Sequence, residues 1–408
     1  MFPSIDVQLS HVLRGAVDVV SEGDLKHMLR EATDKKRPLR VKLGVDPSSP
    51  DLHLGHTVQL RRLRAFQDMG HQAVLIIGDY TAMVGDPSGR NKTRPQLTLE
   101  DVERNTATYM AQAGRILDLG KTEVRRNGEW FGKMTFMEVL KLAARSTVHR
   151  MLERDDFLKR FNEKTPISLH EFLYPLMQGW DSVMIACDIE LGGTDQLFNL
   201  HMGRRLQEQE GQRPQALITG PLIAGLDGEQ KMSKSLGNAI GVTEPAESMF
   251  GKIMSIPDSV MLNWFTLLTK EPKDHIDRLL DAKVTHPRDA KMALARLITT
   301  QFHDAAAAAR GQAQFEAISQ KKLPDDIKDA AVALEGGQVA VWALVKQVHG
   351  GSSSDARRLV QQGGVYLIEP DNLDERTLND EKATFGKGEL DGRVLKVGKR
   401  NFYRLAVK

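Results

Sequence analysis

The chain has 408 residues, of which 41% are hydrophobic and 27% charged, and its net charge is +2. This length predicts two or three globular domains, and the near-neutral charge means that any nucleic-acid-binding surface must be a local basic cluster. A single cysteine, Cys187, excludes disulfides within the chain and zinc sites built on several cysteines. Because no apolar run approaches the roughly 20 residues of a membrane span and the N-terminus does not resemble a signal peptide, we expect a cytoplasmic protein without membrane association.

The first half of the chain alternates strand-like and helix-like patterns. Residues 39–46 predict a strand, 54–70 an amphipathic helix and 72–79 a buried strand, which together form a β-α-β unit. Further elements are predicted along this half: strands at 187–193 and 215–225, and helices around 99–117, 136–161, 168–184 and 195–208. This order predicts an α/β fold, with a Rossmann-like doubly wound parallel sheet over 1–245 and a helical insertion at about 120–165.

The second half predicts two further domains. Residues 246–325 contain helical patterns and no strand, at 246–255, 258–269, 274–282 and 287–320, which indicates an all-α domain. A charged stretch at 320–329 is typical of a linker. Residues 332–408 predict a small α/β domain with two helices and strands at 365–369, 393–399 and 401–407. Its last 16 residues hold six basic residues and no acidic one, a local clustering that favours contacts with RNA phosphates.

Two histidines stand at the start of the first predicted helix, in the stretch PDLHLGHTVQL. His53 and His56 follow a strand directly, and phosphates are commonly bound where strands end and helices begin. Neutral imidazoles can donate N–H bonds to phosphate oxygens, and Gly55 between them lets a nucleotide approach closely. The pair could instead be one packed and one capping histidine. A metal site is less favoured, because no third ligand lies near in sequence.

A second motif, GEQKMSKSLGN at 228–238, places Lys231 and Lys234 in a Gly- and Ser-rich stretch after an apolar strand. Lysines on such a segment can move onto a polyphosphate, although a lysine-rich loop alone is more often a solvated turn. The two motifs together are far more specific than either one.

These motifs carry a family resemblance. HLGH and KMSKS resemble the two signature sequences of class I aminoacyl-tRNA synthetases. KLGVDPSSPDLHLGH, IIGDYTAMVGDPSGRNKTR, EFLYPLMQGWD and LGGTDQLFN are similar to tyrosyl-tRNA synthetases of the bacterial type, and the C-terminal domain resembles a ribosomal protein S-four-like RNA-binding domain. The resemblance implies that L-tyrosine attacks ATP to give tyrosyl-adenylate and pyrophosphate, and that tyrosine then passes to tRNA(Tyr). It also implies Mg²⁺ brought by ATP, no protein-bound metal, and a homodimer formed through residues near 130–160.

The resemblance further implies the site residues. The catalytic set is His53, His56, Lys231, Lys234 and Ser48, and ATP binding adds Gly55, Gly193, Asp195, Arg90 and Arg94. Tyrosine binding is assigned to Lys42, Asp46, Asp86, Tyr174, Gln178, Asp181 and Gln196. RNA binding is assigned to Arg357, Arg358, Lys396, Lys399 and Arg400. The chain departs from the family pattern at Lys42, where many relatives have tyrosine, and at Ser48, where threonine is common.

The spacing within the helix predicted at 168–184 also supports the amino-acid pocket, because positions 174, 178 and 181 share one face of a helix. An Asp that accepts from the substrate hydroxyl would discriminate against phenylalanine, and this family is itself the standard example of that effect. Three other interpretations remain open: a tryptophanyl-tRNA synthetase, a catalytically inactive RNA-binding relative, and a small adenylyltransferase, which accounts for the first half of the chain alone.

Overall fold

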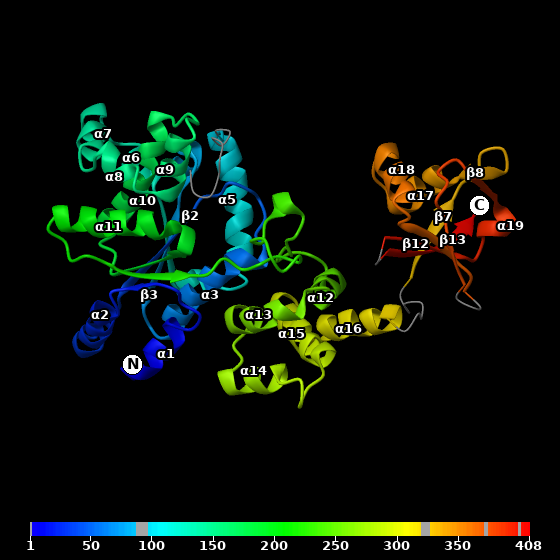
Figure 1. The fold of residues 1–408 in the computed structure, drawn as a ribbon, viewed down its shortest axis with the longest axis horizontal. Coiled ribbons are helices and arrows are strands. Elements are labelled where there is room, and N and C mark those ends of the chain that lie inside the picture. The colour runs from blue at the N-terminus through cyan, green and yellow to red at the C-terminus, as the bar shows by residue number, and fades with distance from the viewer. Residues whose placement is uncertain (1, 87–96, 320–326, 371–373, 399–400) are drawn as a thin grey trace. The chain divides into compact units, whose positions relative to one another are not determined.

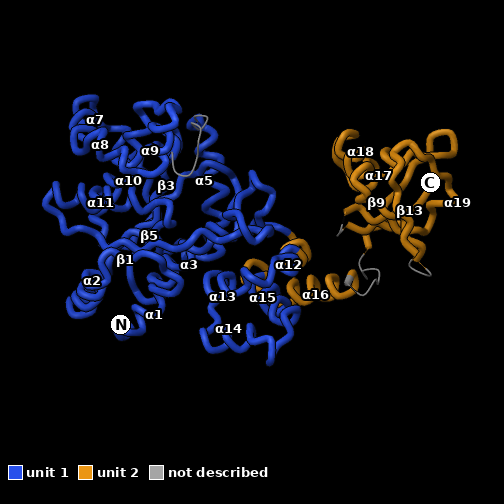
Figure 2. The backbone as a smooth tube through the Cα atoms, in the orientation of Figure 1, with its two compact units in different colours: residues 1–244, 252–298 blue, residues 245–251, 299–408 orange. Residues whose placement is uncertain are grey.

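A computed structural model describes residues 2–86, 97–319, 327–370, 374–398 and 401–408. The chain divides into two compact units, one of residues 1–244 and 252–298 and the other of residues 245–251 and 299–408 (Figure 2). This division crosses two helices, α12 (Ala246–Met254) and α15 (Pro287–Phe302). The three domains predicted from the sequence, at 1–245, 246–325 and 332–408, stay a prediction.

The first unit is built on a six-stranded sheet in the order β1-β6-β5-β2-β3-β4 (Figure 1). All pairs are parallel except β1 with β6. The strands are β1 (Val19–Val20), β2 (Arg40–Val45), β3 (Gln72–Ile77), β4 (Thr122–Arg126), β5 (Ile189–Gly193) and β6 (Ala216–Gly220). From β2 the chain proceeds outward to β3 and β4, then returns to β5 on the other side of β2. Ligands bind at such a switch point, beyond the carboxyl ends of the strands.

Helices cover both faces of this sheet. On one face lie α1 (Ile5–Val12), α2 (Glu22–Lys35) and α3 (Leu54–Asp68), and on the other α10 (Leu173–Met184) and α11 (Leu197–Gln209) (Figure 1). The remaining helices of eight or more residues in this unit are α5 (Leu99–Ala113), α7 (Phe136–Ala143), α9 (Asp155–Asn162), α13 (Met261–Leu268) and α14 (Lys273–Leu280). Four-to-six-residue helices are α4 (Asp79–Val84), α6 (Gly128–Phe131) and α8 (Val148–Met151). The doubly wound α/β fold predicted from the sequence is thereby confirmed.

Two long predicted helices are wrong. The segment predicted as one helix over 136–161 forms α7, α8 and α9, because Thr147 caps a new helix start by accepting the Arg150 N–H. The segment over 287–320 divides into α15 and α16 (Ala305–Ser319), where Asp304 accepts the Ala307 N–H. A side chain that accepts a free backbone N–H stabilises the start of a new helix, so the chain forms two helices where the periodicity alone predicts one.

The helical insertion packs on the sheet through a continuous core. Val74 and Ile76 of β3, Leu206 of α11 and Phe157 of α9 are all fully buried and belong to one cluster. Burying each such side chain contributes about 1.5–3 kcal/mol. This core fixes α10, which carries three of the predicted tyrosine-binding residues.

The second unit holds a five-stranded sheet in the order β10-β9-β12-β13-β7. Its elements include β7 (Lys328–Val332), β9 (Val365–Ile368), β10 (Glu375–Thr377), β12 (Val394–Val397), β13 (Asn401–Val407), α17 (Val341–His349) and α18 (Ser353–Gln361). A separate pair joins β8 (Gln338–Ala340) to β11 (Thr384–Gly386), followed by α19 (Lys387–Leu390). The three predicted strands are confirmed, and β7 begins inside the stretch predicted as a linker. Among the described residues, no helix has the length and apolar character needed to cross a membrane.

Candidate active site

A cavity of about 940 Å³ opens at the carboxyl ends of β2 and β5. Segments more than 180 residues apart in sequence meet in its wall. Of the predicted site residues, those that line it are Asp46, Ser48, His53, Gly55, His56, Asp86, Tyr174, Gln178, Asp181, Gly193, Asp195, Gln196, Lys231 and Lys234. Arg90 and Arg94 lie outside the described residues.

The two histidines cap the helix that they begin. The Nδ1 atom of His53 accepts the Gly55 N–H at 3.2 Å, and the Nδ1 atom of His56 accepts the His53 N–H at 3.1 Å. The rings lie 3.8 Å apart between centroids. Because each Nδ1 acts as an acceptor, each neutral ring carries its proton on Nε2. The capping and phosphate-binding interpretations are therefore compatible: one nitrogen caps the helix and the other remains a donor.

Electrostatics keep these rings neutral. Burial, the neighbouring His56 and the Lys234 ammonium lower the pKa of His53 to about 3. Removal from bulk solvent and Lys234 also lower the pKa of His56, although part of its ring is open to the cavity. Gly55 is required for this arrangement, because a Cβ there would stand 2.9 Å from the His53 ring.

The stretch 228–238, here called the lysine loop, is followed by residues that are hydrogen-bonded to the stretch 50–60, here called the histidine segment. The Leu54 N–H donates to the Ile240 carbonyl at 2.9 Å, and His53 forms an isolated β-bridge with Gly241. Lys234 Nζ lies 2.6 Å from the Asp51 carboxylate, just before the histidines. The two signature segments therefore form one wall of the cavity.

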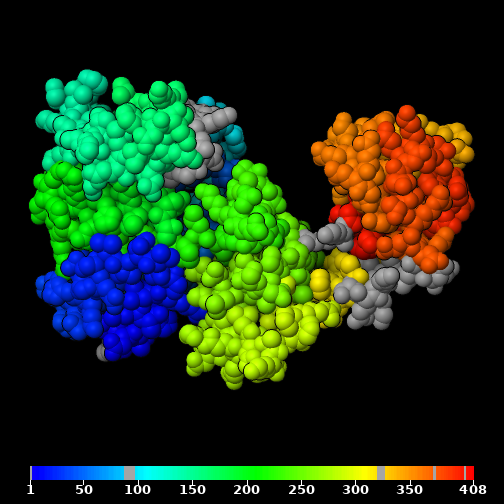
Figure 3. Space-filling model, viewed as in Figure 1, coloured from blue at the N-terminus to red at the C-terminus, as the bar shows by residue number. Residues whose placement is uncertain are grey.

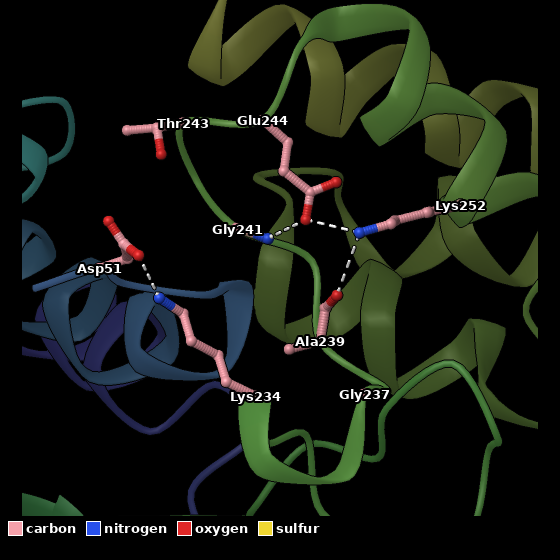
Figure 4. Close-up of a pocket in the computed structure, with 8 residues that line it drawn as sticks. All are labelled: Asp51, Lys234, Gly237, Ala239, Gly241, Thr243, Glu244 and Lys252. Carbon is pink, nitrogen blue, oxygen red and sulfur yellow. Dashed lines mark hydrogen bonds and ion pairs between the residues drawn. The ribbon is translucent and has the colours of Figure 1, made fainter. Parts of the chain in front are cut away.

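A smaller cavity of about 330 Å³ lies beside this loop. Figure 4 shows Lys234 extended to Asp51 on one side of it and Lys252 extended to Glu244 on the other. Glu244 also accepts the Gly241 N–H at 2.8 Å. These contacts hold the segment from Gly237 to Glu244 against Lys252, which lies in the last turn of α12.

The opposite wall comes from α10. Tyr174 Oη donates to Asp46 Oδ2 at 2.8 Å, so the end of β2 and this helix are joined at the cavity. Gln178 accepts from Asn199 Nδ2 at 2.8 Å through Oε1. Gln196 Nε2 donates to Asp86 at 2.9 Å. Asn199 also donates to Gln196 Oε1 at 3.0 Å, so Gln178, Gln196 and Asp86 belong to one hydrogen-bond network.

Asp181 is the most deeply placed carboxylate of this network, with 3% of its surface exposed. It accepts from Trp130 Nε1 at 3.0 Å and from Asn127 Nδ2 at 3.4 Å. Burial raises the pKa of Asp181 to about 7, while Lys42 and these two donors oppose the rise. A carboxylate in this position can accept a hydrogen bond from a ligand hydroxyl.

Lys42 differs from its predicted role. The sequence places it among the tyrosine-binding residues, but its side chain is fully buried and is absent from the described lining of the cavity. Its Nζ lies 2.9 Å from Glu190 and donates to Ser182 Oγ and the Gln178 carbonyl, each at 2.8 Å. These three partners occupy the three N–H donors of the ammonium group, so none is left to donate to a ligand in the pocket.

Sequence reasoning missed the residues that support this pocket. Asn127 and Trp130 follow β4, and Asn199 lies one helical turn after Gln196. Arg154, from the insertion, lies 3.4 Å from Asp86. The rule that polar residues at strand ends face a ligand would have found Asn127 if β4 had been predicted.

The predicted RNA-binding residues of the second unit mostly pair with acids. Arg357 lies 2.7 Å from Glu381 and stacks over Trp342, while Arg358 lies 2.7 Å from Asp355. Lys396 lies 2.8 Å from Glu375, with its Nζ over the Tyr366 ring. Lys399 and Arg400 lie outside the described residues.

Comparisons with known proteins agree with this geometry. Residues 34–320 match the family described as tRNA synthetases class I (W and Y). The fold is also that of solved tyrosyl-tRNA synthetases: a C-terminally truncated mitochondrial enzyme from Aspergillus nidulans has a TM-score of 0.63 at 24% identity, covering 77% of this chain and 94% of that one. An Archaeoglobus fulgidus enzyme solved with L-tyrosine has a TM-score of 0.62 at 24% identity, covering 75% of this chain and 99% of that one.

The fold, the paired signature segments and the family match define a class I aminoacyl-tRNA synthetase. The tyrosine–tRNA ligase of Thermotoga maritima is 51% identical over 98% of this chain and 97% of its own length. That of Moorella thermoacetica is 47% identical over 98% and 95%. The chain belongs to the tyrosine–tRNA ligases within this family.

Proposed function

We propose that the chain activates L-tyrosine with ATP, releasing pyrophosphate, and transfers the tyrosyl group from the adenylate to the 3′ end of tRNA(Tyr). One observation carries the proposal: the histidine segment and the lysine loop form one wall of a single cavity, opposite a helix that presents Tyr174, Gln178 and Asp181.

The first step needs no protein nucleophile. A tyrosine carboxylate oxygen bonds to the α-phosphorus of ATP while the bond from that phosphorus to the pyrophosphate oxygen breaks. His53 and His56 offer Nε2–H donors, and Lys231 and Lys234 offer cations, where negative charge grows on the phosphates. Gly193 and Asp195 would face the ribose, where a carboxylate accepts from hydroxyls. Ser48 and, outside the described residues, Arg90 and Arg94 would add donors.

Tyrosine would lie along α10. Asp181 accepts a hydrogen bond from the phenol hydroxyl at the buried end of the pocket, and Tyr174, Gln178 and Asp86 bind the ammonium group. Gln196 and Asp46 complete the polar wall. A site arranged around a hydroxyl rejects phenylalanine because its own buried groups are then left unpaired.

We further propose that Mg²⁺ enters with ATP. The phosphates supply the hard oxygen ligands that this ion prefers, and the described residues include no group of three or more His, Cys, Asp or Glu side chains placed to hold a metal. When bound, the ion would neutralise phosphate charge. A cytoplasmic location, where ATP and tRNA are found, stays a prediction.

A homodimer is the proposed assembly. Between residues 136 and 169, large apolar side chains stand exposed on the insertion helices, which form the outer rim of the first unit in Figure 3: Phe136, Met137, Leu140, Val148, Phe161 and Leu169. Phe136 and Leu169 are 77% and 84% exposed. So many large exposed apolar side chains within one segment favour an interaction surface, and we propose that a second copy of the chain covers them. In sedimentation equilibrium at micromolar concentration, we expect the parent protein to be a dimer and the F136S/L169S double variant to be a monomer. A monomeric parent would contradict the proposed dimer.

Amino-acid-dependent exchange of labelled pyrophosphate into ATP tests the activation step. Exchange is expected with tyrosine and not with tryptophan or phenylalanine. Exchange driven by tryptophan would assign the chain to the sister specificity, and RNA binding without any exchange would indicate an inactive relative.

A further inference from the structure

A buried ion pair contacts α10, the helix that carries Gln178 and Asp181. Lys42 of β2 and Glu190 of β5 are cross-strand neighbours at the switch point of the sheet, with 2.9 Å between Nζ and Oε1. Their side chains are 0% and 1% exposed. Burying two charges is costly, and apolar residues at such positions are often at least as stabilising, so stability alone does not account for the pair.

Both members of the pair hold the turn of α10 that faces the pocket. Lys42 donates to the Gln178 carbonyl, while Glu190 accepts from Gln178 Nε2 at 3.4 Å. Ser182 bridges the two, because it accepts from Lys42 and donates to Glu190 at 3.0 Å. With Asn199 holding Gln178 Oε1, the amide of Gln178 has one orientation.

The pair also acts on Asp181 through charge. Lys42 from β2 lowers the pKa of Asp181, and Glu190 from β5 raises it. The groups that Asp181 contacts after β4, Asn127 and Trp130, are neutral donors. The two members of the pair therefore influence the same carboxylate in opposite directions.

We propose that the Lys42–Glu190 pair is a positioning and specificity element of the tyrosine pocket, which orients Gln178 and supports Asp181 as the acceptor for the phenol hydroxyl. This inference rests on the proposed function. Lys42 does not contact the substrate. Of Lys42 and Asp181, only Asp181 accepts a hydrogen bond from the substrate hydroxyl.

Three variants test the proposal: Lys42→Met, Glu190→Gln and the double variant. Tyrosine-dependent exchange is measured from pH 5.5 to 9, with phenylalanine as the competing substrate. In Lys42→Met, kcat/KM for tyrosine and its ratio over phenylalanine are expected to fall about tenfold at pH 7, the equivalent of one weakened buried hydrogen bond. The KM for ATP should stay within about twofold of the parent.

The pH profile separates positioning from simple destabilisation. Removing Lys42 raises the pKa of Asp181, so the acidic limb of kcat/KM for tyrosine should move to higher pH. Removing the Glu190 charge should move this acidic limb to lower pH, and the limb of the double variant should lie between those of the two single variants. The matched control is Glu171→Gln, which breaks a buried ion pair with Arg160 of 2.5 Å, at 2% and 3% exposure, away from the cavity lining. It should lower the unfolding temperature without changing the limb or the tyrosine-to-phenylalanine ratio.

The outcomes are distinct. Limbs that move in the same direction for both single variants, or an unchanged ratio in a folded variant, would overturn the inference. If Lys42→Met does not fold, Glu190→Gln and the double variant decide the question by the same limb positions. A parent enzyme without tyrosine-dependent exchange would instead overturn the proposed function.

Discussion

At the scale of single residues, the cavity depends on how backbone and side chain share hydrogen bonds. The Nδ1 atoms of His53 and His56 each accept a hydrogen bond from a backbone N–H at the start of their own helix, so the ring proton is on Nε2. A lysine or arginine at these positions could not cap the helix in this way, because neither has an acceptor. The imidazole is the side chain that both closes the helix start and donates to a ligand.

Gly55→Ala tests the spacing between these rings. The new Cβ would stand 2.9 Å from the His53 ring and 3.3 Å from Ile223, so the ring must move off its cap. We expect the KM for ATP to rise about tenfold, with tyrosine binding measured by fluorescence titration unchanged. Gly23→Ala is the matched control in the first unit, since Gly23 lies in α2 and its Cβ position has only Ser21 Oγ within 4 Å, at 3.9 Å. An unchanged KM for ATP in Gly55→Ala would show that the rings do not contact the nucleotide.

Acid stability tests the neutral state of His53. In the unfolded chain a histidine titrates near 6.5, whereas the folded pKa of His53 is about 3. Below pH 6.5 the unfolded state therefore binds a proton that the folded state does not, so the free energy of unfolding falls as pH falls, by up to about 1.4 kcal/mol per pH unit. Above pH 6.5 neither state binds this proton, so the contribution of His53 to the free energy of unfolding is fully present and no longer changes with pH.

Urea denaturation between pH 7 and 5 is the measurement, and His53→Asn, which keeps a capping acceptor, should flatten the slope. His286→Asn is the control: His286 caps α15 through the same Nδ1 contact to the N–H two residues on, but it is exposed. Equal slopes for the parent and His53→Asn would contradict a buried neutral imidazole.

Most of the candidate site could be predicted from the sequence because its residues follow strands or share a helix face. Asp46 and Asp195 follow the carboxyl ends of β2 and β5, and His53 is the N-cap residue of α3. What the sequence could not reveal is side-chain pairing across strands. The family resemblance assigns Lys42 to the pocket, but its register opposite Glu190 pairs the ammonium group with that buried carboxylate instead.

At the scale of elements, the apolar runs identify the buried strands, and β4 shows the limit. Its residues are charged and only partly buried, since it lies at the sheet edge, so no alternating pattern marks it. The single helix predicted over 136–161 is wrong for another reason: the overall periodicity of the segment is helical, but Thr147 caps a new helix start within it.

The lysine loop gives the prediction at this scale. Asp51 holds Lys234 at 2.6 Å with both side chains more than a third exposed, an interaction of at most about 1 kcal/mol. ATP phosphates would compete with Asp51 for this ammonium group. We expect Asp51→Asn to lower the KM for ATP by up to about fivefold in the exchange assay.

The matched control is Asp68→Asn, which removes an exposed pair of the same 2.6 Å length with Arg64. A raised KM for ATP in Asp51→Asn would mean that Asp51 directs Lys234 toward the nucleotide instead of competing with it.

At the scale of the whole molecule, the two units divide the chemistry. The cavity and both signature segments belong to the first unit, and the basic side chains predicted to contact RNA belong to the second. Adenylate formation and tRNA charging should therefore respond to different substitutions.

Lys396→Ala tests this division. Its ammonium group lies over Tyr366 and near Phe402, a combination suited to phosphate and base contacts. We expect a KM for tRNA raised several-fold and a weaker salt dependence of binding, with pyrophosphate exchange unchanged. Lys328→Ala, an exposed cation of the same sheet, is the control. A loss of exchange in Lys396→Ala would contradict the division.

Charging of tRNA by the full-length chain tests the central claim most directly. Purified protein is incubated with ATP, Mg²⁺, transcribed tRNA(Tyr) or tRNA(Trp), and labelled tyrosine or tryptophan, and acid-precipitable label is counted. We predict that label accumulates with tyrosine on tRNA(Tyr) and in no other combination. Tryptophan attached to tRNA(Trp), or no charging by a protein that binds ATP, would contradict the account.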